Sequence, residues 1–152
     1  MDIIGIQAAY EEASTGYQDG GIPIGSVILD EQGAILGRGH NQRIQKSSPT
    51  LHAEIAALED AGRQKAAVYR KATLYTTLSP CSMCTGAILL YKIPRVVIGE
   101  NVNFKGDEDL LRDRGVEVMV VDNEDCTNLM RRFIQERPEE WNEDIGEAHF
   151  PT

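Results

Sequence analysis

Short apolar runs alternate with segments of helical periodicity throughout the second half of the chain. We expect strands at 73–77, 95–99 and 116–121, and helices at 81–91, 107–113 and 124–136. A strand, a helix and a second strand in succession form a parallel crossover, so this alternation predicts a parallel sheet with helices packed on it. No other feature of the sequence limits the fold as strongly.

The first half of the chain adds an antiparallel pair to that sheet. Residues 2–18 carry apolar side chains at helical spacing, and Asp2 is expected to cap this helix. Apolar runs at 24–29 and 34–38 flank Asp30-Glu31-Gln32-Gly33, which is a hairpin signal. The hairpin therefore contributes two strands that run against each other at one side of the sheet.

The remaining segments complete one domain. We expect a polar loop at 41–49, a helix at 52–62 with Thr50 as cap and Gly62 as stop, and a last helical piece at 138–145. The predicted fold is α/β, a three-layer α/β/α arrangement around a mixed five-stranded sheet. A chain of 152 residues fits a single domain over 1–152, in which 148–152 form a frayed tail.

The charge and composition of the chain exclude several classes of partner. Acidic residues outnumber basic ones 24 to 15, which gives a net charge of −9, whereas a nucleic-acid binder normally presents a basic patch. No apolar stretch approaches the roughly 20 residues of a membrane span, and the first residues lack a signal-peptide pattern. Three cysteines suit a reducing compartment. We expect no nucleic-acid or membrane partner, and a cytoplasmic protein that in a eukaryote can also be nuclear.

Two segments carry metal-binding side chains, His52-Ala53-Glu54 and Pro80-Cys81-Ser82-Met83-Cys84, each at the start of a predicted helix. The two cysteines lie one helical turn apart, so both sulfurs face the same side, and a helix N-terminus favours the thiolate. One imidazole and two thiolates leave a tetrahedral Zn²⁺ one open position, as catalytic zinc requires. We expect one Zn²⁺ per chain on His52, Cys81 and Cys84, with Glu54 as the catalytic carboxylate.

Each half of this pattern also has an ordinary explanation. A lone CxxC can be a redox pair or half of a structural zinc site, and a glutamate in a first helical turn is common. The chain has no second CxxC and no downstream histidine pair that would close a structural site. The combination therefore favours a catalytic centre. Cys126 is interpreted as a small buried hydrophobe, and His40 is assigned no role.

The H-x-E…P-C-x-x-C pattern is the signature of zinc nucleobase deaminases. Beyond it, from Tyr10 to Glu147, the chain resembles the yeast-type (fungal) cytosine deaminases of the zinc-dependent cytidine/deoxycytidylate deaminase superfamily. The further matching stretches are Gly37-Arg38-Gly39-His40-Asn41, Leu74-Tyr75-Thr76-Thr77-Leu78-Ser79-Pro80-Cys81, Gly99-Glu100-Asn101-Val102-Asn103-Phe104-Lys105 and Glu143-Asp144-Ile145-Gly146-Glu147. The resemblance implies a cytidine-deaminase-like fold.

The resemblance also implies an activity, an oligomer and a set of contacts. The activity is hydrolysis of cytosine, as a free base, to uracil and ammonia by a zinc-bound hydroxide, in pyrimidine salvage, with Glu54 moving the protons. A homodimer is implied as well. Asn41 would hydrogen-bond the pyrimidine and Asp144 its amino side, under an apolar lid. The expected substrate-binding residues are Asn41, Asp144, Ala53, Ser79, Phe104, Trp141 and Ile24.

Taken without the resemblance, Asn41 could serve a turn, Asp144 a helix cap and Trp141 a core anchor. The sequence also departs from the family at Ala53, where the yeast-type pattern has glycine, and in a hairpin turn one residue shorter. The alternatives are a deaminase of guanine, cytidine or tRNA adenosine, and a non-catalytic zinc-binding module of the same fold. The acidic charge argues against tRNA, and the presence of Glu54 argues against the non-catalytic module.

Overall fold

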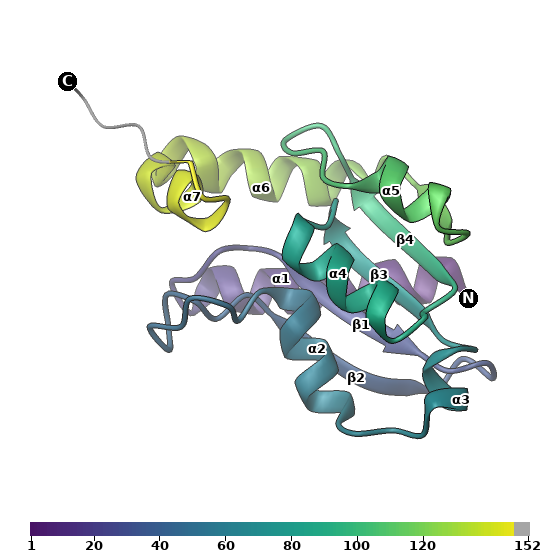
Figure 1. The fold of residues 1–152 in the computed structure, drawn as a ribbon. Coiled ribbons are helices and arrows are strands. Elements are labelled where there is room, and N and C mark those ends of the chain that lie inside the picture. Colours follow the sequence, from purple (N-terminus) through teal and green to yellow (C-terminus); the bar gives the residue numbers. More distant parts are fainter. Residues whose placement is uncertain (148–152) are drawn as a thin grey trace.

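The computed structural model describes residues 1–147, which form three layers around one mixed sheet (Figure 1). The strands are β1 (Gly25–Leu29), β2 (Ile35–His40), β3 (Thr73–Leu78), β4 (Arg95–Glu100) and β5 (Glu117–Val120). Their order is β2-β1-β3-β4-β5; β1 is antiparallel to β2 and β3, and β3, β4 and β5 are parallel. The expected mixed five-stranded sheet is confirmed. The predicted fraying of 148–152 lies outside the described residues.

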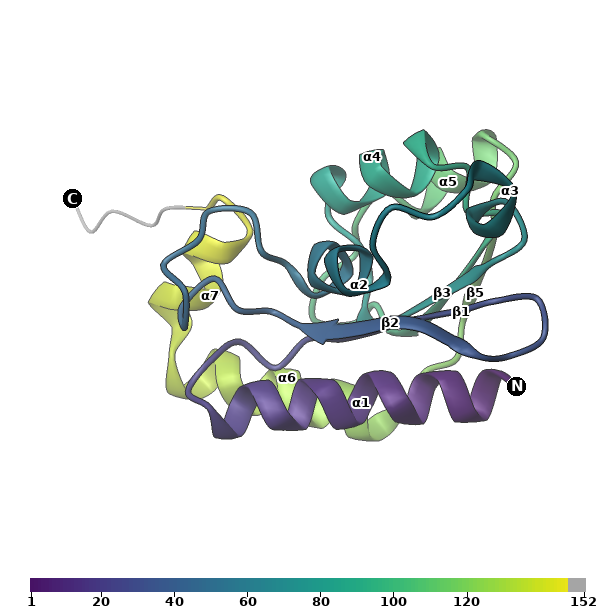
Figure 2. The ribbon, with the colours of Figure 1, turned by 90° about the horizontal axis from the view of Figure 1, so that it is seen from below.

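Helices cover both faces of the sheet (Figure 2). Along one face lie α1 (Asp2–Gln18) and α6 (Glu124–Glu136). The other face carries α2 (Ala53–Ala61), α3 (Ala66–Tyr69), α4 (Ser82–Leu90) and α5 (Glu108–Asp113), and α7 (Pro138–Asp144) lies at one end. None of the described helices is both long and apolar enough to cross a membrane.

The sheet separates two apolar layers because successive side chains of a strand point to opposite faces. On β4, Val97 packs in the cluster that includes Ile6 and Ala9 of α1. Its neighbours Val96 and Ile98 pack in the cluster with α2, α4 and α5. Strands covered on both faces are apolar at nearly every position, which is why β4 appears in the sequence as a continuous hydrophobic run.

Two glycines of β2 bring α2 close to the sheet and so set the position of the site. A Cβ on Gly37 would lie 2.3 Å from the backbone oxygen of Ala57, and one on Gly39 would lie 2.7 Å from the Cβ of Ala56. Only hydrogen atoms at these positions allow the helix backbone to pack directly on the strand. The N-terminus of α2 is thereby held near the carboxyl end of β3, where open α/β sheets bind ligands.

The helix caps differ from the prediction. Met1, not Asp2, is the N-cap of α1, and Asp2 lies in the first turn, where its carboxylate receives hydrogen bonds from Arg95 and Tyr75. Thr50 does not cap α2 either, since the N-cap is His52. The expected stop is correct: Gly62 follows α2 with a φ of 76°, a left-handed conformation that glycine adopts without a steric penalty.

Candidate active site

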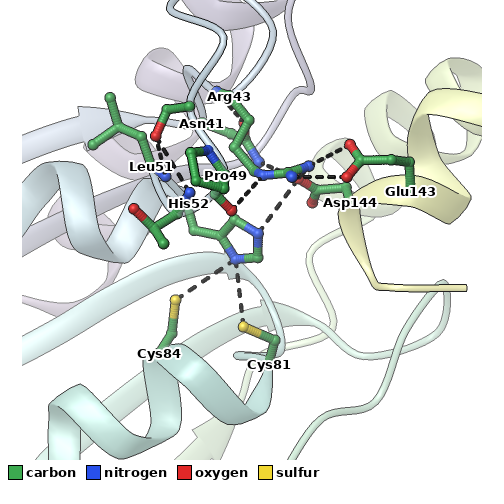
Figure 3. Close-up of polar contacts among 11 residues, drawn as sticks. Asn41, Arg43, Pro49, Leu51, His52, Cys81, Cys84, Glu143 and Asp144 are labelled. Carbon is green, nitrogen blue, oxygen red and sulfur yellow. Dashed lines mark hydrogen bonds and ion pairs between the residues drawn. The ribbon is translucent and has the colours of Figure 1, made fainter.

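The structure brings the imidazole and the two thiols of the motif together (Figure 3). His52 is the N-cap of α2, Cys81 is the N-cap of α4, and Cys84 lies in the first turn of α4. The Nδ1 atom of His52 lies 3.4 Å from Sγ of Cys81 and 3.8 Å from Sγ of Cys84. Within the described part of the chain, this is the group of three ligand atoms that could hold a metal ion.

The three donors fit zinc. Zn–S bonds of about 2.3 Å and Zn–N bonds of about 2.05 Å at a tetrahedral angle place nitrogen and sulfur about 3.6 Å apart. The distances of 3.4 and 3.8 Å lie on either side of that value. Three protein ligands leave the fourth position of a tetrahedral ion open to water or substrate, which is the arrangement of catalytic zinc.

Cys81 has the ionisation that a metal ligand needs. The hydrogen bond from Cys84 and the neighbouring His52 lower the pKa of the Cys81 thiol to about 4, against the opposing effect of burial. The sequence predicted thiolate formation from the helix N-terminus. The structure adds a local cause, because side-chain contacts within the donor set stabilise the anion.

Asp144 orients the histidine from the side opposite the thiols. Its Oδ1 atom lies 3.4 Å from Nε2 of His52, and its side chain is only 2% exposed. Burial alone would raise the pKa of Asp144, but the hydrogen bonds from His52 and Asn41 and the charge of Arg43 lower it below its usual range. A carboxylate on the second ring nitrogen fixes the tautomer in which Nδ1 faces the metal position. The sequence assigned Asp144 to the substrate alone and missed this contact.

Glu54 lies beside the donors without joining them. It follows His52 by two residues on α2 and is 4% exposed. It lines a cavity that His52 and Cys81 also line. Burial raises the pKa of its carboxyl to about 7, although the charge of His52 opposes that shift. Since both protonation states are accessible near neutral pH, Glu54 can accept and return a proton.

An apolar cavity opens onto these groups. Phe104 and Trp141 form an edge-to-face pair over it, with ring centroids 6.1 Å apart and planes at 85°. Its volume is about 20 Å³, enough for about one water molecule. The cavity is therefore small, and it is partly open to solvent. The cavity is lined by Ile24, His52, Ala53, Glu54, Leu78, Ser79, Cys81, Phe104, Trp141, Asp144 and Ile145.

Asn41 does not line this cavity but is joined to it through Asp144. The Asn41 amide donates from Nδ2 to Oδ1 of Asp144 at 3.1 Å, and its Oδ1 accepts from the backbone N–H of Arg43 at 3.0 Å. The side chain is fully buried. One N–H of the amide is not used by these two bonds.

The side-chain hydroxyl of Ser79 is engaged in hydrogen bonds within the protein. It donates to Oε2 of the buried Glu108 at 2.6 Å and accepts from the backbone N–H of Gly106 at 2.9 Å. Ser79 lines the cavity. Any contact with a ligand is therefore left to its backbone atoms.

Sequence reasoning missed Arg43. Its guanidinium donates to both carboxylate oxygens of Glu143 and to Asp144, and so joins the 41–49 loop to α7 (Figure 3). The partners are about a hundred residues apart, and a single sequence holds no signal for such a pair. Leu78 and Ile145, which also line the cavity, were missed as well, although both lie within the matched stretches.

The comparisons agree with the geometry. Residues 3–100 match the family model described as the cytidine and deoxycytidylate deaminase zinc-binding region. The chain is 57% identical over 143 residues to the cytosine deaminase of Candida albicans, which covers 94% of this chain and 95% of that protein. It is 38% identical over 143 residues to the tRNA-specific adenosine deaminase of Haemophilus influenzae, covering 87% of this chain and 82% of that protein. The resemblance to the fungal cytosine deaminases is confirmed.

Solved structures share the fold. A guanine deaminase from Nitrosomonas europaea aligns with a TM-score of 0.67 at 20% identity, covering 87% of this chain and 81% of that chain. A structure from a study of A-to-I editing by tRNA:A34 deaminases aligns with a TM-score of 0.69 at 24% identity, covering 84% and 99%. The cytidine-deaminase-like fold is thus confirmed. The chain belongs to the zinc-binding cytidine and deoxycytidylate deaminase family.

Proposed function

We propose that this protein hydrolyses cytosine to uracil and ammonia. One observation carries the proposal: a buried glutamate, Glu54, lies in a small apolar cavity beside three donors that could hold a zinc ion and is not one of them. A structural zinc site has no need of a titratable carboxylate beside it or of an open position. The 57% identity to a protein named cytosine deaminase supports the choice of substrate.

His52, Cys81 and Cys84 hold the metal in this proposal. Bound zinc lowers the pKa of a coordinated water toward about 7, so that a nucleophile forms near neutral pH. Glu54 accepts the proton of the attacking water on a carboxylate oxygen and passes it to the ring nitrogen beside the reacting carbon. It then transfers the second proton of the water to the departing amine, so that cytosine and water become uracil and ammonia.

Asn41 and Asp144 recognise the polar edge of the pyrimidine. The contacts of Asp144 with Asn41, Arg43 and His52 all fall on Oδ1, so Oδ2 is available to accept from the amino group of the substrate. The unused N–H of Asn41 donates to a ring acceptor. Ile24, Phe104 and Trp141 provide apolar walls for the two faces of the ring, and the backbone of Ala53 and Ser79 completes the rim.

The main alternative is deamination of adenosine in tRNA, since relatives with that name are 37–38% identical to this chain. Two observations favour the free base. The chain has a net charge of −9, unlike a protein that grips a phosphate backbone. In addition, α7 places Trp141 and Asp144 directly at the cavity, where a polynucleotide would have to enter.

We also propose that the enzyme is a homodimer. A groove of about 790 Å³ runs between α2 and α4, and the apolar side chains of Leu90 and Tyr91 beside it are 69% and 48% exposed. A symmetric pair of chains is the commonest assembly. Sedimentation equilibrium tests it: a mass of twice 16.8 kDa is expected, and a monomer at micromolar concentration would refute it.

A cytoplasmic location, extending to the nucleus in a eukaryotic cell, is the last part of the proposal. All three cysteines are free in the structure, and the two at the metal site must stay reduced to bind zinc. Fluorescent tagging of the protein in its source cells tests this: a diffuse cytoplasmic signal is expected, and a signal confined to a membrane-bounded oxidising compartment would refute it.

The substrate is tested by offering cytosine, cytidine, guanine and adenine separately to the zinc-loaded protein and measuring ammonia release. Turnover of cytosine alone is expected. Turnover of cytidine or a purine in place of cytosine would leave the zinc chemistry intact and refute the assigned recognition by Asn41 and Asp144. A protein that binds zinc and deaminates none of the four would support the non-catalytic module.

A further inference from the structure

Two buried carboxylates, Glu100 and Glu108, lie close to the cavity and have no part in the catalytic scheme. Glu100 ends β4 and is fully buried, and Glu108 begins α5 and is 1% exposed. The loop that carries Phe104 connects them (Figure 1). The ion pair of Glu108 with Arg112 is long, at 3.9 Å. Burying a carboxylate is costly unless it is paired or hydrogen-bonded, so the donors around each group show what it holds in place.

Glu108 joins the end of β3 to the Phe104 loop. Its Oε2 atom accepts from the hydroxyl of Ser79 at 2.6 Å, and both its oxygens accept from the amide of Asn101, at 3.2 and 3.3 Å. The Ser79 hydroxyl in turn accepts from the backbone N–H of Gly106 at 2.9 Å. Since a hydroxyl has only one proton to donate, that of Ser79 is committed to Glu108. One donated and one accepted bond therefore fix this side chain.

Glu100 leaves the carbonyl oxygen of Ser79 without a partner. The N–H of Ser79 donates to the backbone oxygen of Glu100 at 3.1 Å, just past the last paired residues of β3 and β4. In a regular parallel ladder, the N–H of Val102 would donate next to the carbonyl of Ser79. The carboxylate of Glu100 accepts that N–H instead, at 2.7 Å. Among residues 1–147, no hydrogen bond to the Ser79 carbonyl is present.

This carbonyl is the polar group of Ser79 that remains available to the cavity. Ser79 lines the cavity and is 3% exposed, and its N–H and hydroxyl are both engaged. A buried backbone C=O without a donor is uncommon and calls for a ligand or water to supply one. The amino group of cytosine has two N–H donors, of which Asp144 accepts one in the proposed function. The second can pair with the Ser79 carbonyl.

We propose that Glu108 is a positioning residue for this reaction. By holding the hydroxyl of Ser79, it fixes the backbone at the end of β3 so that the Ser79 carbonyl meets the amino group of the substrate. This role rests on the proposed function, whereas the tie between Glu108, Ser79 and Gly106 does not. Glu108 itself touches no reacting atom.

Glu108→Met tests the role, because it removes the acceptor and keeps a side chain of similar length. The KM for cytosine should rise about three- to tenfold, the factor for one hydrogen bond, while kcat and zinc content stay nearly constant. Glu108→Gln keeps an oxygen that can accept from Ser79 and should restore the KM of the unaltered protein. Asp109→Asn is the control, since it removes the neighbouring exposed charge, and should leave the KM unchanged.

Inhibition by pyrimidin-2-one separates positioning from a general loss of structure. This compound is the same ring with hydrogen in place of the amino group, so it has no N–H for the Ser79 carbonyl at that place. Its inhibition constant should be equal in Glu108→Met and in the unaltered protein. An equal loss for cytosine and pyrimidin-2-one would show that Glu108 only supports the shape of the cavity, and would overturn the proposal.

The route through Ser79 is tested by Ser79→Ala and by the double variant. Glu108→Met, Ser79→Ala and the double variant should all raise the KM by the same factor, because each breaks the same tie. Factors that multiply in the double variant would mean that Glu108 acts by another route, and the proposal would be wrong.

Hydrogen exchange of the Gly106 amide, measured without ligand, separates the tie from the choice of substrate. Exchange should be faster in Ser79→Ala and in Glu108→Met than in the unaltered protein, and unchanged in Asp109→Asn. Unchanged exchange in the first two variants would overturn the tie. If exchange changes as expected but the unaltered protein releases no ammonia from cytosine, the proposed function fails, and the assigned partner of the Ser79 carbonyl fails with it.

Discussion

The two buried carboxyl groups of the site, Glu54 and Asp144, are tuned in opposite directions by their surroundings. Burial raises the pKa of Glu54 to about 7. Asp144 is buried as well, but donors from His52, Asn41 and Arg43 hold its pKa below its usual range. The two carboxyl groups therefore have different roles. Glu54 can exchange protons near neutral pH, and Asp144 stays an anion that orients its neighbours.

At the residue scale, Asp144→Asn tests whether this anion supports the metal site. We expect zinc affinity to fall about 10- to 100-fold, the usual cost of losing a carboxylate partner of a metal-binding histidine. Competition with a chelating dye measures it. Glu140→Gln, on the same helix, is the control and should bind zinc normally. Unchanged affinity in Asp144→Asn would mean that the aspartate serves the substrate alone.

The zinc donors and Glu54 could be predicted from the sequence because their spacing is local. His52 and Glu54 share one helix start, and Cys81 and Cys84 share another. The contacts that orient them could not be predicted. Arg43 and Asp144 meet across a hundred residues, and the pairing of Ser79 with Glu108 depends on how the chain turns after β4.

At the scale of elements, long periodic segments were predicted best. The predicted helix 124–136 matches α6 to the residue, and the structure adds its cap, since the side chain of Asn123 accepts from the backbone N–H of Cys126. The prediction missed α3, because Ala66–Tyr69 is a single turn and too short to show a period. It also ended β2 two residues early, at Arg38, since Gly39 and His40 resemble the start of a loop and yet pair with β1.

The start of α1 is tied to the sheet by an ion pair that the capping prediction did not foresee. Arg95 of β4 donates to both oxygens of Asp2 at 2.7 Å, and Tyr75 donates to the same carboxylate at 2.7 Å. These contacts lower the pKa of Asp2 from 3.8 to about 2, with the Arg95 bond as the largest cause. The first turn of α1 is therefore anchored by charge to the middle of the sheet.

Asp2→Asn should lower the free energy of unfolding by about 1–2 kcal/mol at neutral pH, as expected for a partly buried, charge-assisted pair. Because folding lowers the pKa of Asp2, its contribution is complete above about pH 4 and is lost as the pH falls through about 2. Urea unfolding of both proteins across this range measures the difference. Glu11→Gln, whose contact with Arg38 is long and exposed, should change stability by less than about 0.5 kcal/mol. A difference that does not vary with pH would contradict this account.

At the scale of the whole molecule, the site is assembled from distant parts of the chain. The metal donors come from α2 and α4, the proposed recognition groups from the 41–49 loop and α7, and one wall from the loop after β4. An ion that joins α2 to α4 binds only the folded arrangement, so it should stabilise the whole domain.

Removal of zinc should therefore lower the unfolding temperature by on the order of 10 °C, given ≈ 4.1 kcal/mol at a thousandfold excess over Kd and a few degrees per kcal/mol. Differential scanning calorimetry with and without a chelator measures this. Cys84→Ser is the control, because it should unfold at the lower temperature and respond little to added zinc. An equal response in the two proteins would show that the stabilising ion binds elsewhere.

The central claim is that Glu54 moves protons and does not bind the metal. It is tested most directly by Glu54→Gln, with zinc content and cytosine turnover measured on the same preparation. The account predicts one zinc per chain and a loss of turnover of at least about 10²-fold, since the amide cannot exchange protons. Loss of zinc together with activity, or turnover that survives the substitution, would contradict it.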